Sequence, residues 1–156
     1  MAYQNVLVCL DLRSQEAPRL IDRALSMARD PRMVTALTVI EMGTHDEERD
    51  VFASLIEEVY LSRSAHLARI CKGADISVEQ QRVLVGRAAT EIATFSSEHA
   101  IDLVVLGEHG GRLLRPFLGS TTYQALHLLD CDALVVRSDP RSDGQDSNHG
   151  SVTRHD

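Results

Sequence analysis

The chain has 156 residues, which is one domain's length and leaves no room for a second substrate domain. Apolar residues make up 44% and charged residues 25%, the balance of a globular protein with a buried core. The formal net charge of −7 disfavours nucleic-acid binding, since proteins that bind polyanions carry the opposite excess.

The sequence also limits the location of the protein. It contains no run of about 18 apolar residues that would span a membrane. Its N-terminal stretch carries Asp11 and lacks the basic region of a signal peptide. Cys9, Cys71 and Cys131 are odd in number and form no CxxC pair, so we expect reduced, buried thiols in a cytoplasmic protein. The histidines form no HxxxH or HExxH pair, so no metal site is expected.

Short apolar runs alternate with helical patterns along the chain. The runs cover residues 5–10, 33–40, 76–85, 102–107 and 132–137, and the helical patterns cover residues 16–29, 46–71, 88–99 and 120–129. The first run and the last two are nearly continuous in Val and Leu, which is typical of strands buried on both faces of a parallel sheet. The third run alternates as an edge strand does. The order βαβαβαβαβ predicts an α/β fold with a twisted parallel sheet and right-handed crossovers.

The longest helical pattern, over residues 46–71, predicts an amphipathic helix with one apolar side and a charged opposite face. Its apolar residues share one side, and they are Phe52, Leu55, Ile56, Val59, Leu67 and Ile70. The composition changes after residue 137, because residues 138–156 are polar apart from Val152. Such a segment cannot offset the entropy of ordering it. We therefore expect a folded domain over 1–137 and a disordered or loosely held tail over 138–156.

Ligands of open parallel sheets bind at the carboxyl ends of the strands, and two strand ends carry suitable residues. Asp11 ends the first strand, and Gly107 ends the fourth and opens the glycine-containing segment 107–122. We expect Gly119, Ser120 and Thr121 to present N–H groups and hydroxyls to a phosphate at the start of the last helix, with Arg112 and Arg115 nearby. The segment is neither a Walker A loop nor a GxGxxG fingerprint, and a purely structural strand-to-helix connection stays open.

Several segments, in order, resemble those of the universal stress protein family. They are the first strand through Asp11, Leu37 to Glu41, Val85-Gly86 with the following helix, and the last two strands at 102–107 and 131–137. The resemblance covers about residues 2–137. It implies a flavodoxin-like three-layer sandwich with a sheet of order 3-2-1-4-5, and a homodimer built along the last strand, 132–137.

Part of that family binds ATP through a glycine motif, and the resemblance carries its ligand residues onto this chain. Asp11 would hold the ribose or the adenine edge, and the backbone of Val39 would contact adenine. The remaining contacts, to ribose and phosphates, would come from Gly107, Gly110, Gly119 and Ser120, with Thr121 beside them. Here Gly110 and Gly119 are separated by eight residues where the family has nine, and Glu108 places a negative charge in the loop.

Three functional hypotheses follow. The first is a cytoplasmic dimer of the stress response that binds ATP, with or without Mg²⁺, as a switch or sensor with little turnover and an unidentified protein partner. The second is a nucleotide-free dimeric interaction protein, favoured by the short spacer and Glu108. The third is an adenine-nucleotide-dependent transferase or hydrolase. No acid–base constellation in the sequence supports it, so we expect no enzyme beyond weak ATPase or autophosphorylation activity.

Overall fold

The computed structural model describes residues 2–42, 46–108 and 119–139. Strands and α-helices alternate through these ranges, with two short 3₁₀ turns. The elements are β1 (Val6–Cys9), α1 (Ala17–Met27), η1 (Pro31–Met33), β2 (Val34–Glu41), α2 (Asp46–Lys72), η2 (Val78–Gln80), β3 (Gln81–Gly86), α3 (Ala88–Glu98), β4 (Leu103–Gly107), α4 (Ser120–Leu128) and β5 (Asp132–Val136). No helix in the described ranges is both long enough and apolar enough to cross a membrane.

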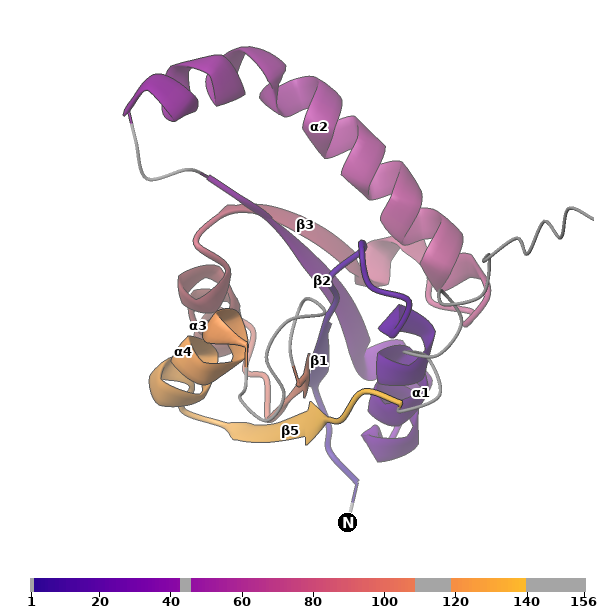
Figure 1. Ribbon diagram of the computed structural model, residues 1–156. Helices are drawn as coiled ribbons and strands as arrows, with labels where there is room; N and C mark the ends of the chain where they lie inside the picture. Colours follow the sequence, from indigo (N-terminus) through magenta and orange to yellow (C-terminus); the bar gives the residue numbers. More distant parts are fainter. Residues whose placement is uncertain (1, 43–45, 109–118, 140–156) are drawn as a thin grey trace, which may run out of the picture.

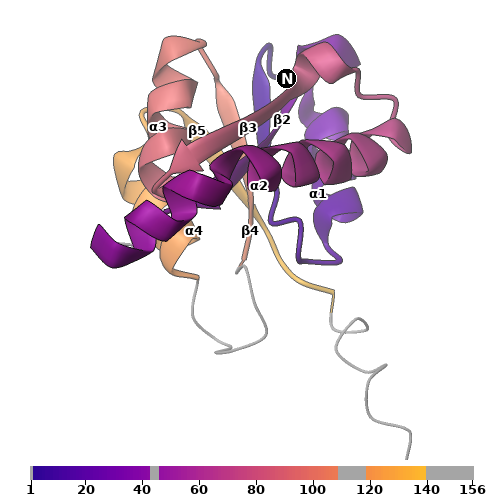
Figure 2. The ribbon, with the colours of Figure 1, turned by 90° about the horizontal axis from the view of Figure 1, so that it is seen from above.

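The strands form one parallel sheet of order β3-β2-β1-β4-β5, so the predicted flavodoxin-like fold is confirmed. At the centre, Val6 pairs with Val34 on one side and with Leu103 on the other. Helices α1 and α2 lie on one face and α3 and α4 on the other, which gives three layers (Figures 1 and 2). β3 lies at one edge of the sheet, as its alternating pattern predicts, and β5 lies at the opposite edge.

Alternation along the central strands divides the core into two clusters. Val6 and Val8 point toward α1 and the end of α2, where they pack with Ile21 and Leu67. Leu7 lies between them in the chain and points to the other face, toward α3 and α4. Successive side chains of a strand point to opposite sides. Both faces of β1 are therefore buried, which explains its continuous Val and Leu sequence.

Within the side chains that the structure describes, the apolar side of α2 is buried only toward the end of the helix. Leu67 is buried against the sheet, whereas the side chain of Leu55 is 48% exposed. Figures 1 and 2 show that the first turns of α2 extend beyond the body of the molecule. An amphipathic pattern gives the side of a helix that is apolar but not how far its partner surface reaches. Phe52 lies outside the side chains that the structure describes.

The third strand begins later than the apolar run predicts. Residues 78–80 form the turn η2, and β3 starts at Gln81. The side-chain amide of Gln80 donates to the carbonyls of Pro31 and Val34 at 2.9 and 2.8 Å, which fixes the turn against the start of β2. Val78 is exposed, while Ile76 is buried in the cluster under α1 and α2. These long-range contacts override the local alternation.

Gly86 joins β3 to α3 with a φ of +152°, a conformation that side chains rarely adopt. A Cβ built at this position would lie 2.6 Å from an oxygen of Glu91. We expect Gly86→Ala to lower the free energy of unfolding by about 1–3 kcal/mol. Gly73→Ala is the matched control, because a Cβ at Gly73 would lie 3.7 Å from the carbonyl oxygen of Ile70, an ordinary contact. Urea unfolding measures both; an equal response would contradict the strain at Gly86.

Burial raises the pKa of the Cys71 thiol to about 11. The folded protein keeps this thiol neutral, whereas the unfolded chain ionises it near pH 9. Its contribution to stability is therefore complete below pH 9 and is lost as the pH rises toward 11. We expect the free energy of unfolding to fall by about 2 kcal/mol from this group between about pH 8 and pH 10.5. Urea titrations should show a shallower fall in Cys71→Ala; an unchanged slope would contradict the prediction.

Candidate functional site

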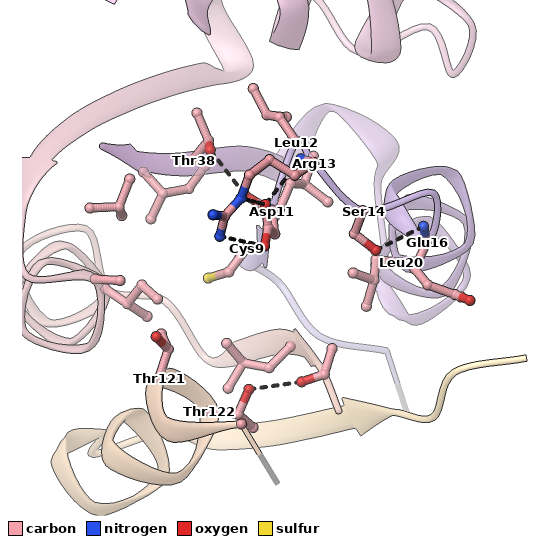
Figure 3. Close-up of a pocket in the computed structure, with 18 of the residues that line it drawn as sticks. Cys9, Asp11, Leu12, Arg13, Ser14, Glu16, Leu20, Thr38, Thr121 and Thr122 are labelled. Atoms are coloured by element: carbon pink, nitrogen blue, oxygen red, sulfur yellow. Dashed lines mark hydrogen bonds and ion pairs between the residues drawn. The ribbon is translucent and has the colours of Figure 1, made fainter. Parts of the chain in front are cut away.

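A cavity of about 790 Å³ opens at the carboxyl ends of β1, β2 and β4 (Figure 3). Its base is formed by the end of β1 with the chain that follows it (residues 9–14), by residues 37–41 of β2, and by the end of β4 with Glu108 (residues 106–108). Gly119 and the first turn of α4 close one side, and Val59 and Arg63 of α2 line another. The position is the one that parallel α/β sheets use for ligands, and the volume is that of a small-molecule site.

The structure brings together most of the residues predicted to hold a ligand. They come from separate parts of the chain, and those that line the cavity are Asp11, Val39, Gly107, Gly119, Ser120 and Thr121. Gly110, Arg112 and Arg115 lie outside the described residues. The predicted strand ends and the start of α4 thus line one cavity.

The carboxylate of Asp11 is held by Arg13, two residues later. Nε of Arg13 lies 3.1 Å from Oδ1, Nη2 lies 3.1 Å from Oδ2, and the backbone N–H of Arg13 donates to Oδ1 at 3.0 Å. These bonds to the carboxylate raise the pKa of the Arg13 guanidinium, so it stays charged. Sequence reasoning missed this pairing. The Asp-x-Arg spacing is the sequence signal that could have indicated it. The same spacing occurs at Asp30 and Arg32, which also form an ion pair.

The start of α4 offers fewer free donors than the sequence predicts. The N–H of Gly119 donates to the carbonyl of Glu108 at 2.9 Å, so it does not point into an anion site. The buried hydroxyl of Thr122 donates to the carbonyl of Gly107 at 2.8 Å and connects α4 to the end of β4. Ser120 and Thr121 hold the first helical positions, whose N–H groups have no partner within the helix. The helix dipole still favours an anion beside them.

Glu108 is directed toward the chain that follows β5. Its Oε2 accepts from the backbone N–H of Ser138 at 3.1 Å. The neighbouring N–H of Asp139 donates to Glu16 at 3.3 Å. Two residues of the predicted tail are therefore bound at the rim of the cavity, and residues 140–156 lie outside the described part of the chain. The charge that the sequence places in the glycine segment is thus turned toward β5.

Buried polar contacts position the chain at the end of β1. The hydroxyl of Thr38 donates to the carbonyl of Leu10 at 3.0 Å, and the N–H of Leu10 donates to the carbonyl of Leu37 at 2.8 Å. These two bonds fix the turn that carries Asp11 to the cavity. Cys9 precedes this turn, and burial raises the pKa of its thiol, so it stays neutral near pH 7.

The described lining of the cavity is acidic overall. Its carboxylates are Asp11, Glu16, Glu41 and Glu108, and its guanidinium groups are Arg13 and Arg63. No local pattern marks Glu16, Glu41 or Arg63, because folding brings them from the start of α1, the end of β2 and the middle of α2. A polyanionic ligand bound here needs the arginines or a counter-cation.

Comparisons with known proteins identify the family of this chain. The model of the universal stress protein family matches residues 2–137. Universal stress protein A homolog 2 of Coxiella burnetii is 30% identical over 139 residues, covering 86% of this chain and 95% of the relative.

Two solved structures match the fold across nearly their whole length. A hypothetical protein, solved as a test case of structural genomics for assigning biochemical function, has a TM-score of 0.73 at 19% identity and covers 89% of this chain and 99% of its own. A universal stress protein in complex with cAMP has a TM-score of 0.57 at 24% identity, with coverage of 87% and 98%. From the match over residues 2–137, this chain belongs to the universal stress protein family.

Proposed function

We propose that this protein binds an adenine nucleotide, ATP with or without Mg²⁺, in the cavity at the carboxyl ends of the strands. The nucleotide acts as a switch or sensor in a cytoplasmic dimer of the stress response. The observation that carries the proposal is the convergence of Asp11, Val39, Gly107 and the Ser120–Thr121 turn on one cavity of about 790 Å³. A family member in complex with cAMP supports an adenine nucleotide as the ligand class.

The chemistry of the cavity suits the parts of such a ligand. Val39, Ile40, Ile92 and Leu106 line it with apolar surface, which is favourable for a purine ring. The Asp11 carboxylate is a strong acceptor for a ribose hydroxyl or an exocyclic amino group. The N-terminal turn of α4 supplies unpaired N–H groups, hydroxyls and the positive end of a helix dipole for a phosphate.

We infer that turnover is slow or absent. Phosphoryl transfer needs a positioned nucleophile with a base, and the described lining contains no histidine. Ser120 and Thr121 have hydroxyls, but no hydrogen bond to a carboxylate or an imidazole is present for either in the described part of the chain. Binding without chemistry is the behaviour expected of a sensor.

The dimer would form along β5. This strand pairs with β4 on one side and is the sheet edge on the other. Asp132 and Ala133 are exposed there, and so are Tyr123 and Leu128 of the adjoining α4. Edge strands present unpaired backbone groups, so an edge of this kind is a natural pairing surface. Sedimentation equilibrium tests the state: a mass of twice the chain supports the dimer, and a monomer at micromolar concentration opposes it.

A second function is favoured by the acidic lining. Glu16, Glu41 and Glu108 oppose a polyphosphate, and the Gly119 N–H is already bonded to Glu108. Both facts suit a nucleotide-free interaction protein whose glycine segment is structural. Such a protein would recognise a protein partner through its surface and leave the cavity without a nucleotide.

Calorimetric titration separates the two functions. The protein is first shown to carry no co-purified nucleotide, and ATP is then titrated with and without Mg²⁺. Micromolar binding supports the nucleotide sensor. Absence of heat and of a thermal shift up to millimolar ATP would overturn it in favour of the interaction protein. Phosphate release, measured in the same samples, is expected to stay near background.

A further inference from the structure

Arg13 covers the Asp11 carboxylate, to which the proposed nucleotide would hydrogen-bond. It bonds both oxygens of Asp11 and lies over the carboxylate on the side of the cavity across from Thr121 and Thr122 (Figure 3). A ligand that hydrogen-bonds to Asp11 must therefore share the carboxylate with Arg13 or displace it.

A ligand can displace Arg13 from Asp11 because Arg13 is exposed to solvent. The side chain of Arg13 is 76% exposed, while that of Asp11 is 25% exposed. The same bonds form between Asp30 and Arg32, which do not line this cavity, so the arrangement is a local property of the Asp-x-Arg turn. Exposed ion pairs of this kind contribute little, and releasing one changes an affinity by up to about fivefold.

Displacement has opposite consequences for two classes of ligand. A nucleoside offers Asp11 a neutral hydroxyl or amino group and leaves Arg13 without its partner. A nucleotide also brings a phosphate, which a guanidinium binds with paired, charge-assisted hydrogen bonds. With Asp11 engaged, Glu16, Glu41 and Glu108 still surround the cavity, and Arg13 is one of two guanidinium groups in its described lining.

We propose that Arg13 is a specificity-determining residue that masks Asp11 from nucleosides and moves to the phosphate when a nucleotide binds. This inference rests on the proposed nucleotide site and adds its preference for phosphorylated ligands. Arg13 therefore competes with the ligand for the Asp11 carboxylate. Only an anionic ligand offsets the loss of that ion pair, because its phosphate binds the released guanidinium.

The test compares adenosine with AMP by calorimetry in wild type, Arg13→Gln and Arg32→Gln. In Arg13→Gln the affinity for adenosine is expected to rise up to about fivefold, because Asp11 is unmasked. The affinity for AMP is expected to fall about fivefold or more, so the preference for AMP over adenosine drops by at least about fivefold. Arg32→Gln removes an equivalent exposed pair and is expected to change neither affinity.

The outcomes distinguish this inference from the function on which it rests. If wild type binds neither adenosine nor AMP nor ATP, the nucleotide site itself is wrong. If wild type binds AMP but Arg13→Gln changes both affinities by the same factor, or leaves both unchanged, the role of Arg13 is overturned. A thermal melt of each variant verifies that the fold is intact, which is expected because Arg13 is exposed.

Discussion

Replacing Asp11 with alanine is expected to weaken adenosine binding by about 10- to 100-fold, the effect of losing a hydrogen bond to a charged acceptor. Asp11 is held at the cavity by the turn that Leu10 and Thr38 fix, so the loss reflects a preorganised group. AMP should lose less than adenosine, because the variant removes one negative charge and frees Arg13 for the phosphate. Calorimetric titration of both ligands measures the difference.

Asp30→Ala is the matched control for this change. Asp30 accepts hydrogen bonds from the backbone N–H and the guanidinium of Arg32, just as Asp11 does from Arg13, but it lies at the start of η1. The control should therefore lose the same kind of local pairing without losing affinity. Asp11→Ala with adenosine affinity within about twofold of wild type would remove Asp11 from the site, since a charged hydrogen bond is worth more than that.

The sheet could be predicted from the sequence because its determinants are local. β1, β4 and β5 are short Val- and Leu-rich runs, and the helical patterns between them leave a parallel arrangement as the consistent solution. The strand order required the resemblance to a known family, since periodicity does not specify which strands are neighbours. Errors occur where distant residues decide the structure, as at η2, which Gln80 fixes against β2.

The site was predictable to the same extent. Asp11 and Gly107 follow buried strands, and strand ends of a parallel sheet meet at one edge, so their proximity follows from the topology. The hydrogen bonds formed at that edge of the sheet do not follow from the topology. The N–H of Gly119 is bonded to Glu108, and the Glu108 side chain is bonded to Ser138, because the end of β5 lies beside the end of β4. Only the folded chain brings these groups together.

A substitution in the hydrophobic core is expected to have the second large effect, a loss of stability that can be measured separately from ligand binding. Leu7 is fully buried in β1 and packs with Leu37, Val104 and Ala125 on the face covered by α3 and α4. We expect Leu7→Ala to lower the free energy of unfolding by about 3 kcal/mol, through lost burial and the cavity that remains. The melting temperature should fall by roughly 10 °C.

Two further variants make the measurement specific. Leu7→Met conserves volume and is expected to cost less than about 1.5 kcal/mol, and Leu61→Ala, on the exposed part of α2, less than about 0.5 kcal/mol. Equal losses in Leu7→Ala and Leu61→Ala would contradict the assignment of the core. Leu7 does not line the cavity, so ATP at about 100 times its dissociation constant should still stabilise the folded variant by about 2.7 kcal/mol. If ATP stabilises Leu7→Ala by the same amount as wild type, the packing at the centre of the sheet does not set the affinity of the site.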